Sequence, residues 1–360
     1  MTNFLVTGGA GFIGANFVHY MRTKRPDDRI VVLDALTYAG NRGNLNSLEG
    51  KENFSFIHGD ICDTALVENI LRDDDIDTIV HFAAESHVDR SIEGPDIFLQ
   101  TNIMGTHSLL KAAKKIWLDE KRGIDNRFHH VSTDEVYGTL SLDNPAFSEI
   151  TPYAPNSPYS ASKAASDHLV RAYHHTYGLN VTTSNCSNNY GPYQFPEKLI
   201  PLFILNGLHG KPLTIYGDGQ QIRDWLHVED HCRGIELILD KGKPGEVYNI
   251  GGNCERQNIQ VIDTLCAELD HAFKGDRRLA ERFADAPAAR DAPTASLKTY
   301  VTDRPGHDRR YAIDATKIET ELGYRPKRTF ETGFAETFAW YLENEKWWRD
   351  ILDGSYRGCI

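Results

Sequence analysis

A glycine-rich turn close to the amino terminus restricts the fold more than any other feature of the chain. A short apolar run at residues 4–7 leads into Gly8, Gly9, Gly11 and Gly14, and an amphipathic stretch follows. Gly9, Gly11 and Gly14 match G-x-G-x-x-G, and Gly8, Gly11 and Gly14 match a wider spacing. Glycine allows a tight turn, close approach of a pyrophosphate and close packing of helix on strand. The pattern predicts the first strand–turn–helix unit of a dinucleotide-binding fold.

An acidic residue stands where such a fold would contact a ribose. Asp34 ends the second β-branched run and follows Gly14 by about 20 residues, the distance at which a carboxylate binds the ribose hydroxyls. A carboxylate there repels a 2′-phosphate, so NAD is favoured over NADP. Asp60 and Ile61, after the third run, are expected to reach the adenine. A glycine-rich turn that binds no dinucleotide, and a simple turn aspartate at position 60, are the alternatives.

The order of the apolar runs predicts the architecture. Short β-branched runs alternate with helical patterns at residues 102–115 and 159–177, which is typical of a Rossmann-type, doubly wound parallel α/β sheet. After about residue 190 proline and glycine become denser, which predicts a smaller α/β substrate-binding lobe. We therefore expect a first domain over 1–185, with returning segments near 226–256, and a second, interleaved lobe mainly over 186–360. The expected strands cover residues 4–7, 30–33, 54–57, 78–83, 128–133, 180–185 and 247–251.

Composition narrows the choice of partners. The 360 residues include 39 Lys and Arg against 51 Asp and Glu, a formal net charge of −12, which argues against nucleic acid as a partner. No apolar run reaches the roughly 18 residues of a membrane helix, and no signal-peptide pattern is present, so we expect a cytoplasmic protein. The cysteines and histidines form no zinc-binding pattern, so no metal is expected.

Two candidate catalytic residues lie one helical turn apart. Tyr159 and Lys163 form a Y-x-x-x-K pattern, which places a phenol and an ammonium on one helix face. A neighbouring cation is expected to lower the pKa of the phenol and to make Tyr159 a base for a sugar hydroxyl. A solvated surface pair is the alternative when the pattern stands alone.

Two adjacent acids follow the fifth expected strand. Thr133, Asp134 and Glu135 lie at its carboxyl end, where open α/β sheets bind their ligands. Hydride transfer needs no carboxylates, whereas elimination of water needs a base and an acid. Burial can push the pKa values of the two acids apart, so that one is neutral and the other ionised. The alternative is a polar loop with two solvated acids.

Taken together, these motifs identify a family. The chain resembles the extended short-chain dehydrogenase/reductase superfamily and, within it, the dTDP-glucose 4,6-dehydratases, over roughly residues 3–350. The pairing of Thr-Asp-Glu with Y-x-x-x-K is the specific part of the resemblance. The matching stretches are residues 7–14, 36–41, 59–63, 83–91, 132–138, 153–163, 185–192, 197–201, 221–226 and 303–307.

The resemblance implies two sets of binding residues. Those for NAD, with the glycines of the turn included, are Gly8, Gly11, Phe12, Ile13, Gly14, Asp34, Ala35, Leu36, Thr37, Asp60, Ile61, Phe82, Ala83, Ala84, Glu85, Ser86, Thr101, Tyr159, Lys163 and Asn189. Those for the nucleotide-sugar are Ser86, Thr133, Asn188, Lys198, Leu199, Thr214, Ile215, Tyr216, Arg223, Asn258, Asp303, Arg304, Pro305, Gly306 and His307. The cations among them suit a diphosphate.

The resemblance also implies a reaction and an assembly. dTDP-glucose would lose water to give dTDP-4-keto-6-deoxyglucose, with tightly held NAD regenerated in each turnover and Thr133, Asp134, Glu135, Tyr159 and Lys163 as the catalytic residues. A homodimer would form through helices at 98–118 and 158–176. The alternatives are a nucleotide-sugar 4-epimerase, which needs no C5 base, a dehydratase of another nucleotide-hexose, and a non-catalytic NAD-binding protein.

Overall fold

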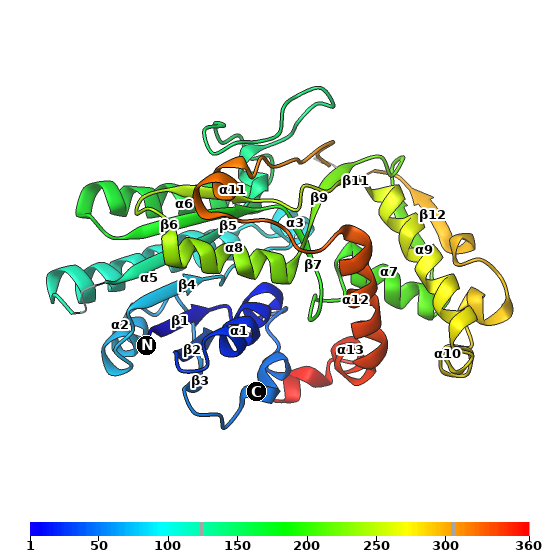
Figure 1. Cartoon of the computed structure of the whole chain (residues 1–360), viewed down its shortest axis with the longest axis horizontal. Helices are drawn as coiled ribbons and strands as arrows, with labels where there is room; N and C mark the ends of the chain where they lie inside the picture. Colours follow the sequence, from blue (N-terminus) through cyan, green and yellow to red (C-terminus); the bar gives the residue numbers. More distant parts are fainter. Residues whose placement is uncertain (123–124, 304–306, 360) are drawn as a thin grey trace.

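A seven-stranded parallel sheet forms the centre of the molecule (Figure 1). The computed structural model describes residues 1–122, 125–303 and 307–359. The strand order is β10-β6-β5-β4-β1-β2-β3, and every neighbouring pair is parallel. This order confirms the expected Rossmann-type fold, and it places a topological switch point between β1 and β4. The strands are β1 (Asn3–Thr7), β2 (Arg29–Asp34), β3 (Phe54–His58), β4 (Thr78–His81), β5 (Arg127–Thr133), β6 (Val181–Cys186) and β10 (Val247–Ile250).

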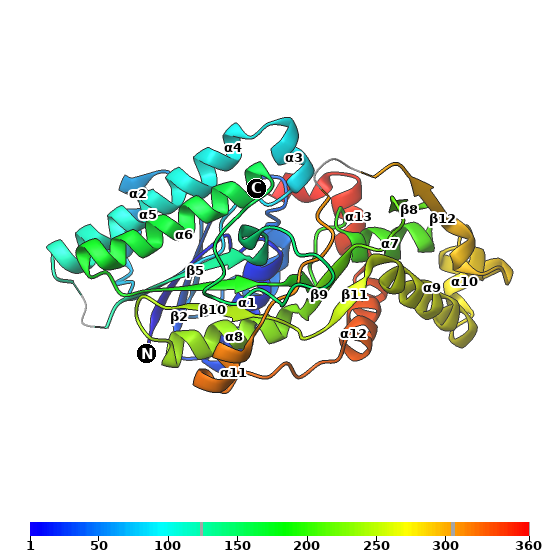
Figure 2. The same ribbon diagram turned by 90° about the horizontal axis from the view of Figure 1, so that it is seen from above.

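Helices cover both faces of this sheet (Figure 2). α1 (Phe12–Lys24), α8 (Val228–Lys241) and α11 (Thr316–Leu322) lie on one face, where Phe17, Ile235 and Ile318 join the same buried cluster. α2 (Thr64–Asp73), α5 (Thr106–Ala113) and α6 (Pro158–Tyr177) cover the other face. β1, β2 and β4 are therefore buried on both sides, which explains why they read as short apolar runs rather than as alternating ones.

The helix expected over 102–115 is longer than predicted and is not a uniform α-helix. It runs through α4 (Asp96–Phe98), the π-helical segment η2 (Leu99–Gly105), α5, and a second π-helical segment, η3 (Lys114–Asp119). A π-turn shifts the side chains that follow it around the helix axis, and such turns are often found at functional sites.

The second lobe has its own core. Phe203, Leu265, Phe334 and Trp348 meet in a buried cluster separate from those around the large sheet. Two small sheets, β11-β9-β7 and β12-β8, complete this lobe. Its elements are β7 (Asn188–Tyr190), α7 (Leu199–Leu208), β8 (Leu213–Tyr216), β9 (Ile222–His227), β11 (Glu255–Gln257), α9 (Asn258–Gly275), α10 (Arg278–Arg282), η5 (Pro287–Arg290), η6 (Thr294–Leu297), β12 (Lys298–Val301), α12 (Phe330–Glu343) and α13 (Glu345–Leu352).

The two lobes interleave along the chain. The strand expected at 247–251 is confirmed as β10, which returns to the large sheet beside β6. α11 returns as well, which the sequence did not predict. β4 ends at His81, so the expectation that it extends to residue 83 was wrong. The domain boundaries themselves stay a prediction. The remaining short helices are η1 (Arg42–Leu48), α3 (Val88–Glu93), η4 (Asp134–Tyr137) and η7 (Ser355–Cys359).

In the described parts of the chain, no helix has both the length and the apolar character needed to cross a membrane. The cytoplasmic location stays a prediction.

Candidate active site

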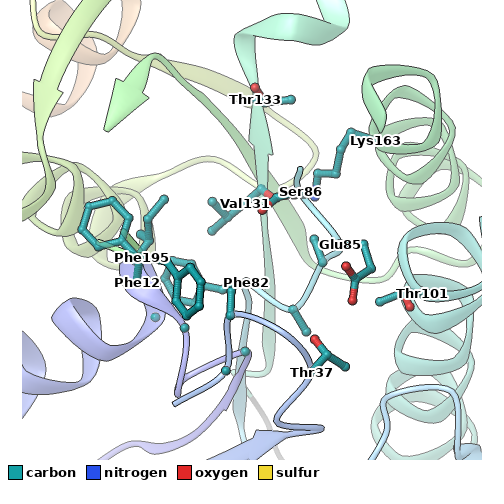
Figure 3. A pocket seen from close by; sticks show the side chains of 18 of the residues that line it. Phe12, Thr37, Phe82, Glu85, Ser86, Thr101, Val131, Thr133, Lys163 and Phe195 are labelled. Atoms are coloured by element: carbon teal, nitrogen blue, oxygen red, sulfur yellow. Dashed lines mark hydrogen bonds between the residues drawn. The ribbon is translucent and has the colours of Figure 1, made fainter. Parts of the chain in front are cut away.

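A pocket of about 380 Å³ opens at the carboxyl ends of β1, β4 and β5, where the switch point lies (Figure 3). It brings together most of the residues expected at the site. The expected residues that line it are Gly8, Gly11, Phe12, Ile13, Gly14, Asp34, Ala35, Thr37, Asp60, Ile61, Phe82, Ala83, Ala84, Glu85, Ser86, Thr101, Thr133, Asp134, Glu135, Tyr159, Lys163, Asn188, Asn189 and Lys198.

The turn after β1 and the first turn of α1 each contain a position that accepts only glycine. Gly8 has a φ of +69°, and a Cβ there would lie 2.5 Å from the backbone nitrogen of Ala83. A Cβ on Gly14 would lie 2.2 Å from the carbonyl oxygen of Gly8. α1 begins at Phe12 after Gly11, and no side chain caps its first amides. Those amides therefore suit an anionic group, and the turn fits a pyrophosphate.

The carboxylate at the end of β2 suits a ribose. Asp34 is 8 % exposed, and its two oxygens accept hydrogen bonds from the backbone nitrogens of Ala10 at 2.9 Å and Leu36 at 2.8 Å. Burial raises the pKa of Asp34, while these two hydrogen bonds oppose the shift. Each oxygen keeps a further lone pair, which a ribose hydroxyl can use. Together with the glycine turn, this arrangement fits NAD.

The acid pair begins where β5 ends. Thr133 caps the short helix η4, accepts a hydrogen bond from the Glu135 nitrogen at 3.3 Å and donates one to Asp134 Oδ1 at 3.4 Å. Asp134 is 2 % exposed, and its Oδ2 is buried without a hydrogen-bond partner in the described parts of the chain. Burial first, and then the charges of Glu135 and Asp224, raise the pKa of Asp134 well above its usual value. The raised pKa favours the neutral form of Asp134, which lies beside a half-buried Glu135.

α6 presents Tyr159 and Lys163 to the same pocket. A reciprocal cap between Ser157 and Ser160, with Pro158 in the first turn, sets the start of this helix. Tyr159 is 9 % exposed and faces the ring edge of Phe98.

The expected effect of Lys163 on the pKa of Tyr159 was wrong for this arrangement. Burial and the charge of Glu135 raise the pKa of Tyr159 well above its usual value. Lys163 Nζ instead donates to the carbonyl oxygen of Val131 at 2.8 Å, and burial lowers the pKa of Lys163 itself. Figure 3 shows the lysine side chain reaching from its helix toward Val131. Desolvation of the phenolate is the largest of the influences on this pKa.

A second group of expected residues gathers in the smaller lobe. Asp303 accepts hydrogen bonds from Gln221 Nε2 at 3.0 Å and His307 Nδ1 at 2.6 Å, and the ring of His307 lies 6.4 Å from that of Tyr216. The Asn258 nitrogen donates to the Gln221 carbonyl oxygen at 2.9 Å. Those expected residues that are described but do not line the pocket are Leu36, Leu199, Thr214, Ile215, Tyr216, Arg223, Asn258, Asp303 and His307.

Two of these residues are already engaged in contacts within the protein. The side chain of Ile215 is 2 % exposed and packs in the core of the second lobe, so a ligand can meet only its backbone. Leu36 has a φ of 51°, and its backbone nitrogen donates a hydrogen bond to Asp34. Residues 304–306 lie outside the described residues. All the ligand contacts expected of these positions stay predictions.

Arg223 connects the two groups. It is 7 % exposed, its Nη2 donates to the Asp308 carbonyl oxygen at 3.0 Å, and its guanidinium lies 4.3 Å from the ring centre of Tyr311. Its positive charge opposes the rise in the pKa of Asp134. This arginine is thus close enough to act on the acid pair while it is held against the smaller lobe.

Several residues at the site were not expected from the sequence. Tyr38, Cys186, Phe195 and Glu197 also line the pocket. Phe195 and Glu197 lie within or beside matched stretches, so their position along the chain was a usable signal. Asp167 follows Lys163 by four residues, a spacing that puts both on one helix face and that was not used.

Comparisons with known proteins agree with the pocket. The family model described as GDP-mannose 4,6 dehydratase matches residues 5–337. The dTDP-glucose 4,6-dehydratase of Xanthomonas campestris pv. campestris (strain B100) is 58 % identical over 99 % of this chain and 98 % of its own. The enzyme of that name from Escherichia coli is 54 % identical over 98 % and 97 %.

A solved structure gives the same result. The dTDP-glucose 4,6-dehydratase DesIV from Streptomyces venezuelae, determined with NAD bound, superposes with a TM-score of 0.84. It is 48 % identical and covers 97 % of this chain and all of its own. The chain therefore belongs to the dTDP-glucose 4,6-dehydratase family of the extended short-chain dehydrogenases/reductases.

Proposed function

We propose that this chain converts dTDP-glucose into dTDP-4-keto-6-deoxyglucose and water, with NAD as a cofactor that is regenerated in every turnover. The observation that carries the proposal is the acid pair Asp134 and Glu135, which lines the same pocket as the glycine turn, Tyr159 and Lys163. Named relatives with matching length support the choice of substrate. A 4-epimerase would have no use for two acids at this place.

Oxidation at C4 would begin with Tyr159. Bound NAD would accept a hydride from C4, return it later to C6, and bring the positive charge of the nicotinamide into the pocket. Tyr159 takes the proton of the C4 hydroxyl, and the Thr133 hydroxyl holds the same oxygen. Burial raises the pKa of Tyr159, so the phenol must first give up its own proton before it can act as this base. Positive charges in the pocket favour the phenolate that results.

Elimination of water uses the acid pair. The C4 ketone acidifies the hydrogen on C5, and Glu135 takes this proton. Asp134, whose neutral form is favoured because burial raises its pKa, gives its proton to the C6 hydroxyl, which leaves as water. Glu135 afterwards returns a proton to C5. The oxidation and the later reduction cancel, so the reaction needs no external oxidant, and the protein has no need to release the cofactor.

Product analysis in deuterium oxide tests the proposal. The purified chain is incubated with dTDP-glucose, and with UDP- and GDP-hexoses in parallel. We expect a 4-keto-6-deoxy product from dTDP-glucose, with one solvent deuterium at C5. A C4 epimer without solvent label would establish the epimerase instead. A chain that binds NAD and leaves every hexose nucleotide unchanged would be the non-catalytic alternative.

A homodimer is part of the proposal. The helices at 96–119 and α6 run side by side along one edge of the molecule (Figure 2), as four-helix pairing requires. Exposed apolar side chains support a partner at this edge, since Ile92, Leu99 and Met104 are 45–52 % exposed. Isolated apolar residues are normal on a surface, but a group of this kind marks an interface.

Substitution of Met104 tests the dimer. A charge at an apolar interface is strongly unfavourable, so Met104→Glu is expected to halve the mass measured by sedimentation. Ile150→Glu is the matched control, because Ile150 is 92 % exposed in the loop between η4 and α6, outside these helices, and it is expected to keep the parental mass. A Met104→Glu chain that sediments as the parent does would place the interface elsewhere.

A further inference from the structure

Asp167, a buried carboxylate on the helix that carries Tyr159 and Lys163, has no part in the proposed steps of the dehydration. Asp167 lies on α6, four residues after Lys163 and eight after Tyr159, so the three share one face of the helix. We infer that Asp167 is a positioning residue, which keeps the Lys163 ammonium charged inside the protein and ties the end of β5 to the helix that carries Tyr159. The inference rests on the proposed dehydration, whose active groups Asp167 would hold in place.

The contacts of Asp167 join three segments of the chain. Its Oδ1 accepts a hydrogen bond from His130 Nε2 at 3.0 Å, and its Oδ2 accepts one from Ser132 Oγ at 2.9 Å. Tyr153 Oη also donates to Oδ2 at 2.9 Å. Ser132 directly precedes Thr133 in β5, and Tyr153 lies in the loop that leads to α6. A carboxylate that is 5 % exposed thus holds the strand, the loop and the helix together.

The charge of Asp167 supports the buried ammonium. Burial lowers the pKa of Lys163, and Asp167 is the largest influence that raises it, followed by Cys186 of β6. An unpaired ammonium in a buried site would lose its proton. Two histidines also lie near Asp167 and Lys163. His81 of β4 and His130 of β5 have pKa values lowered well below the usual one by burial, so neither is charged.

Asp167 itself titrates in an accessible range. Burial raises the pKa of Asp167 to about 6, while Lys163, Ser132, Tyr153 and His168 oppose the shift. Above that pH the carboxylate is ionised, and its negative charge favours the ammonium form of Lys163. Below about pH 6 Asp167 takes a proton, and Lys163 loses this favourable negative charge. Removing the carboxylate permanently, as in Asp167→Asn, lowers the pKa of Lys163 further, so the lysine loses its charge at a lower pH.

The pH dependence of turnover measures this effect. In Asp167→Asn we expect kcat to fall by about 10–100-fold, the range for loss of a partner that orients an active group, with little change in KM. The alkaline limb of kcat should move to lower pH, because Lys163 deprotonates earlier. Asp167→Glu restores the charge and should recover part of kcat and the parental limb. Measurements run over pH 5–10 with dTDP-glucose and saturating NAD.

Asp230→Asn is the matched control. Asp230 is 1 % exposed on α8, and it accepts hydrogen bonds from the nitrogens of Lys327 and Arg328, both at 3.0 Å. Its loss should lower the melting temperature without moving the pH profile. If Asp167→Asn behaves in the same way, with a parental profile, Asp167 is structural and the inference is overturned. If Asp167→Asn does not fold, the test uses Asp167→Glu instead. A parental kcat together with an alkaline limb displaced from that of the parent would then contradict the inference.

A readout without substrate separates this inference from the proposed function. ¹³Cε-lysine NMR, with the resonance assigned from Lys163→Met, follows the protonation of Lys163 directly. We expect its titration midpoint to be lower in Asp167→Asn than in the parent. If the parent makes no keto sugar but the midpoint moves, the proposed function fails and the role of Asp167 in holding the charge stands. An unchanged midpoint overturns the role of Asp167, whatever the activity.

Discussion

Glu135→Gln is expected to reduce bound NAD once per site and then to stop. A glutamine cannot take the C5 proton, whereas oxidation at C4 uses Tyr159 and is left intact. Loss of a general base costs about 10²–10⁴-fold, so steady-state formation of the keto sugar should fall by that factor. Absorbance at the wavelength of reduced NAD, followed in a single turnover, should show a stoichiometric rise that persists instead of decaying.

Glu149→Gln is the control for this substitution. Glu149 lies in the loop after β5, where its Oε1 accepts a hydrogen bond from the Asn249 nitrogen at 2.9 Å, and it is not among the described residues that line the pocket. The same change there should leave turnover close to the parental rate. Parental turnover in Glu135→Gln would remove Glu135 from the elimination step.

Asp134→Asn is expected to lower activity and to raise stability. Asparagine has no acidic proton for the departing C6 hydroxyl, so turnover should fall by about 10²–10⁴-fold. Because burial raises the pKa of Asp134, its favourable contribution to folding is complete below the unfolded pKa, near 4, and is lost as pH rises through the folded value. The neutral asparagine carries no such loss. The melting temperature of the variant should therefore exceed that of the parent by a margin that grows as pH rises above the unfolded pKa.

Asp218→Asn is the control, because its effect on the melting temperature should have the opposite sign. Asp218 is exposed, and a backbone hydrogen bond from Gln220 and the side chain of Arg309 lower its pKa. Its contribution to stability is present above the unfolded pKa and disappears as pH falls, so its loss should be felt near neutral pH and vanish in acid. If the melting difference for Asp134→Asn shrinks as pH rises, Asp134 is ionised in the folded protein and cannot be the acid.

The sequence predicted several strands of the large sheet because burial of β1, β2 and β4 on both faces leaves short apolar runs. The strand at residues 247–251 was recognisable from Val247, Tyr248 and Ile250 despite its distance from the others. The end of β4 was not, because Phe82 and Ala83 are as apolar as the strand itself and only the hydrogen-bond pattern separates them. The π-helical turns at Leu99–Gly105 and Lys114–Asp119 leave no mark in apolar spacing either.

At the site, motifs predicted which residues meet but not how they are oriented. Thr133, Asp134, Glu135, Tyr159 and Lys163 do line one pocket. The direction of the lysine depends on the Val131 carbonyl, which is distant in sequence and carries no side-chain signal. The high pKa of Tyr159 depends in the same way on burial and on Glu135, which only the folded arrangement sets.

The strand-to-helix connection from β5 to α6 supplies every group proposed to exchange a proton with the sugar. Most of the residues expected to hold the nucleotide come later in the chain, from β7 onward. Chemistry and recognition are therefore encoded in separate stretches. Substitutions can change how the protein binds a base or a diphosphate while the catalytic groups keep their positions. Such a chain can acquire a new substrate without first losing its reaction.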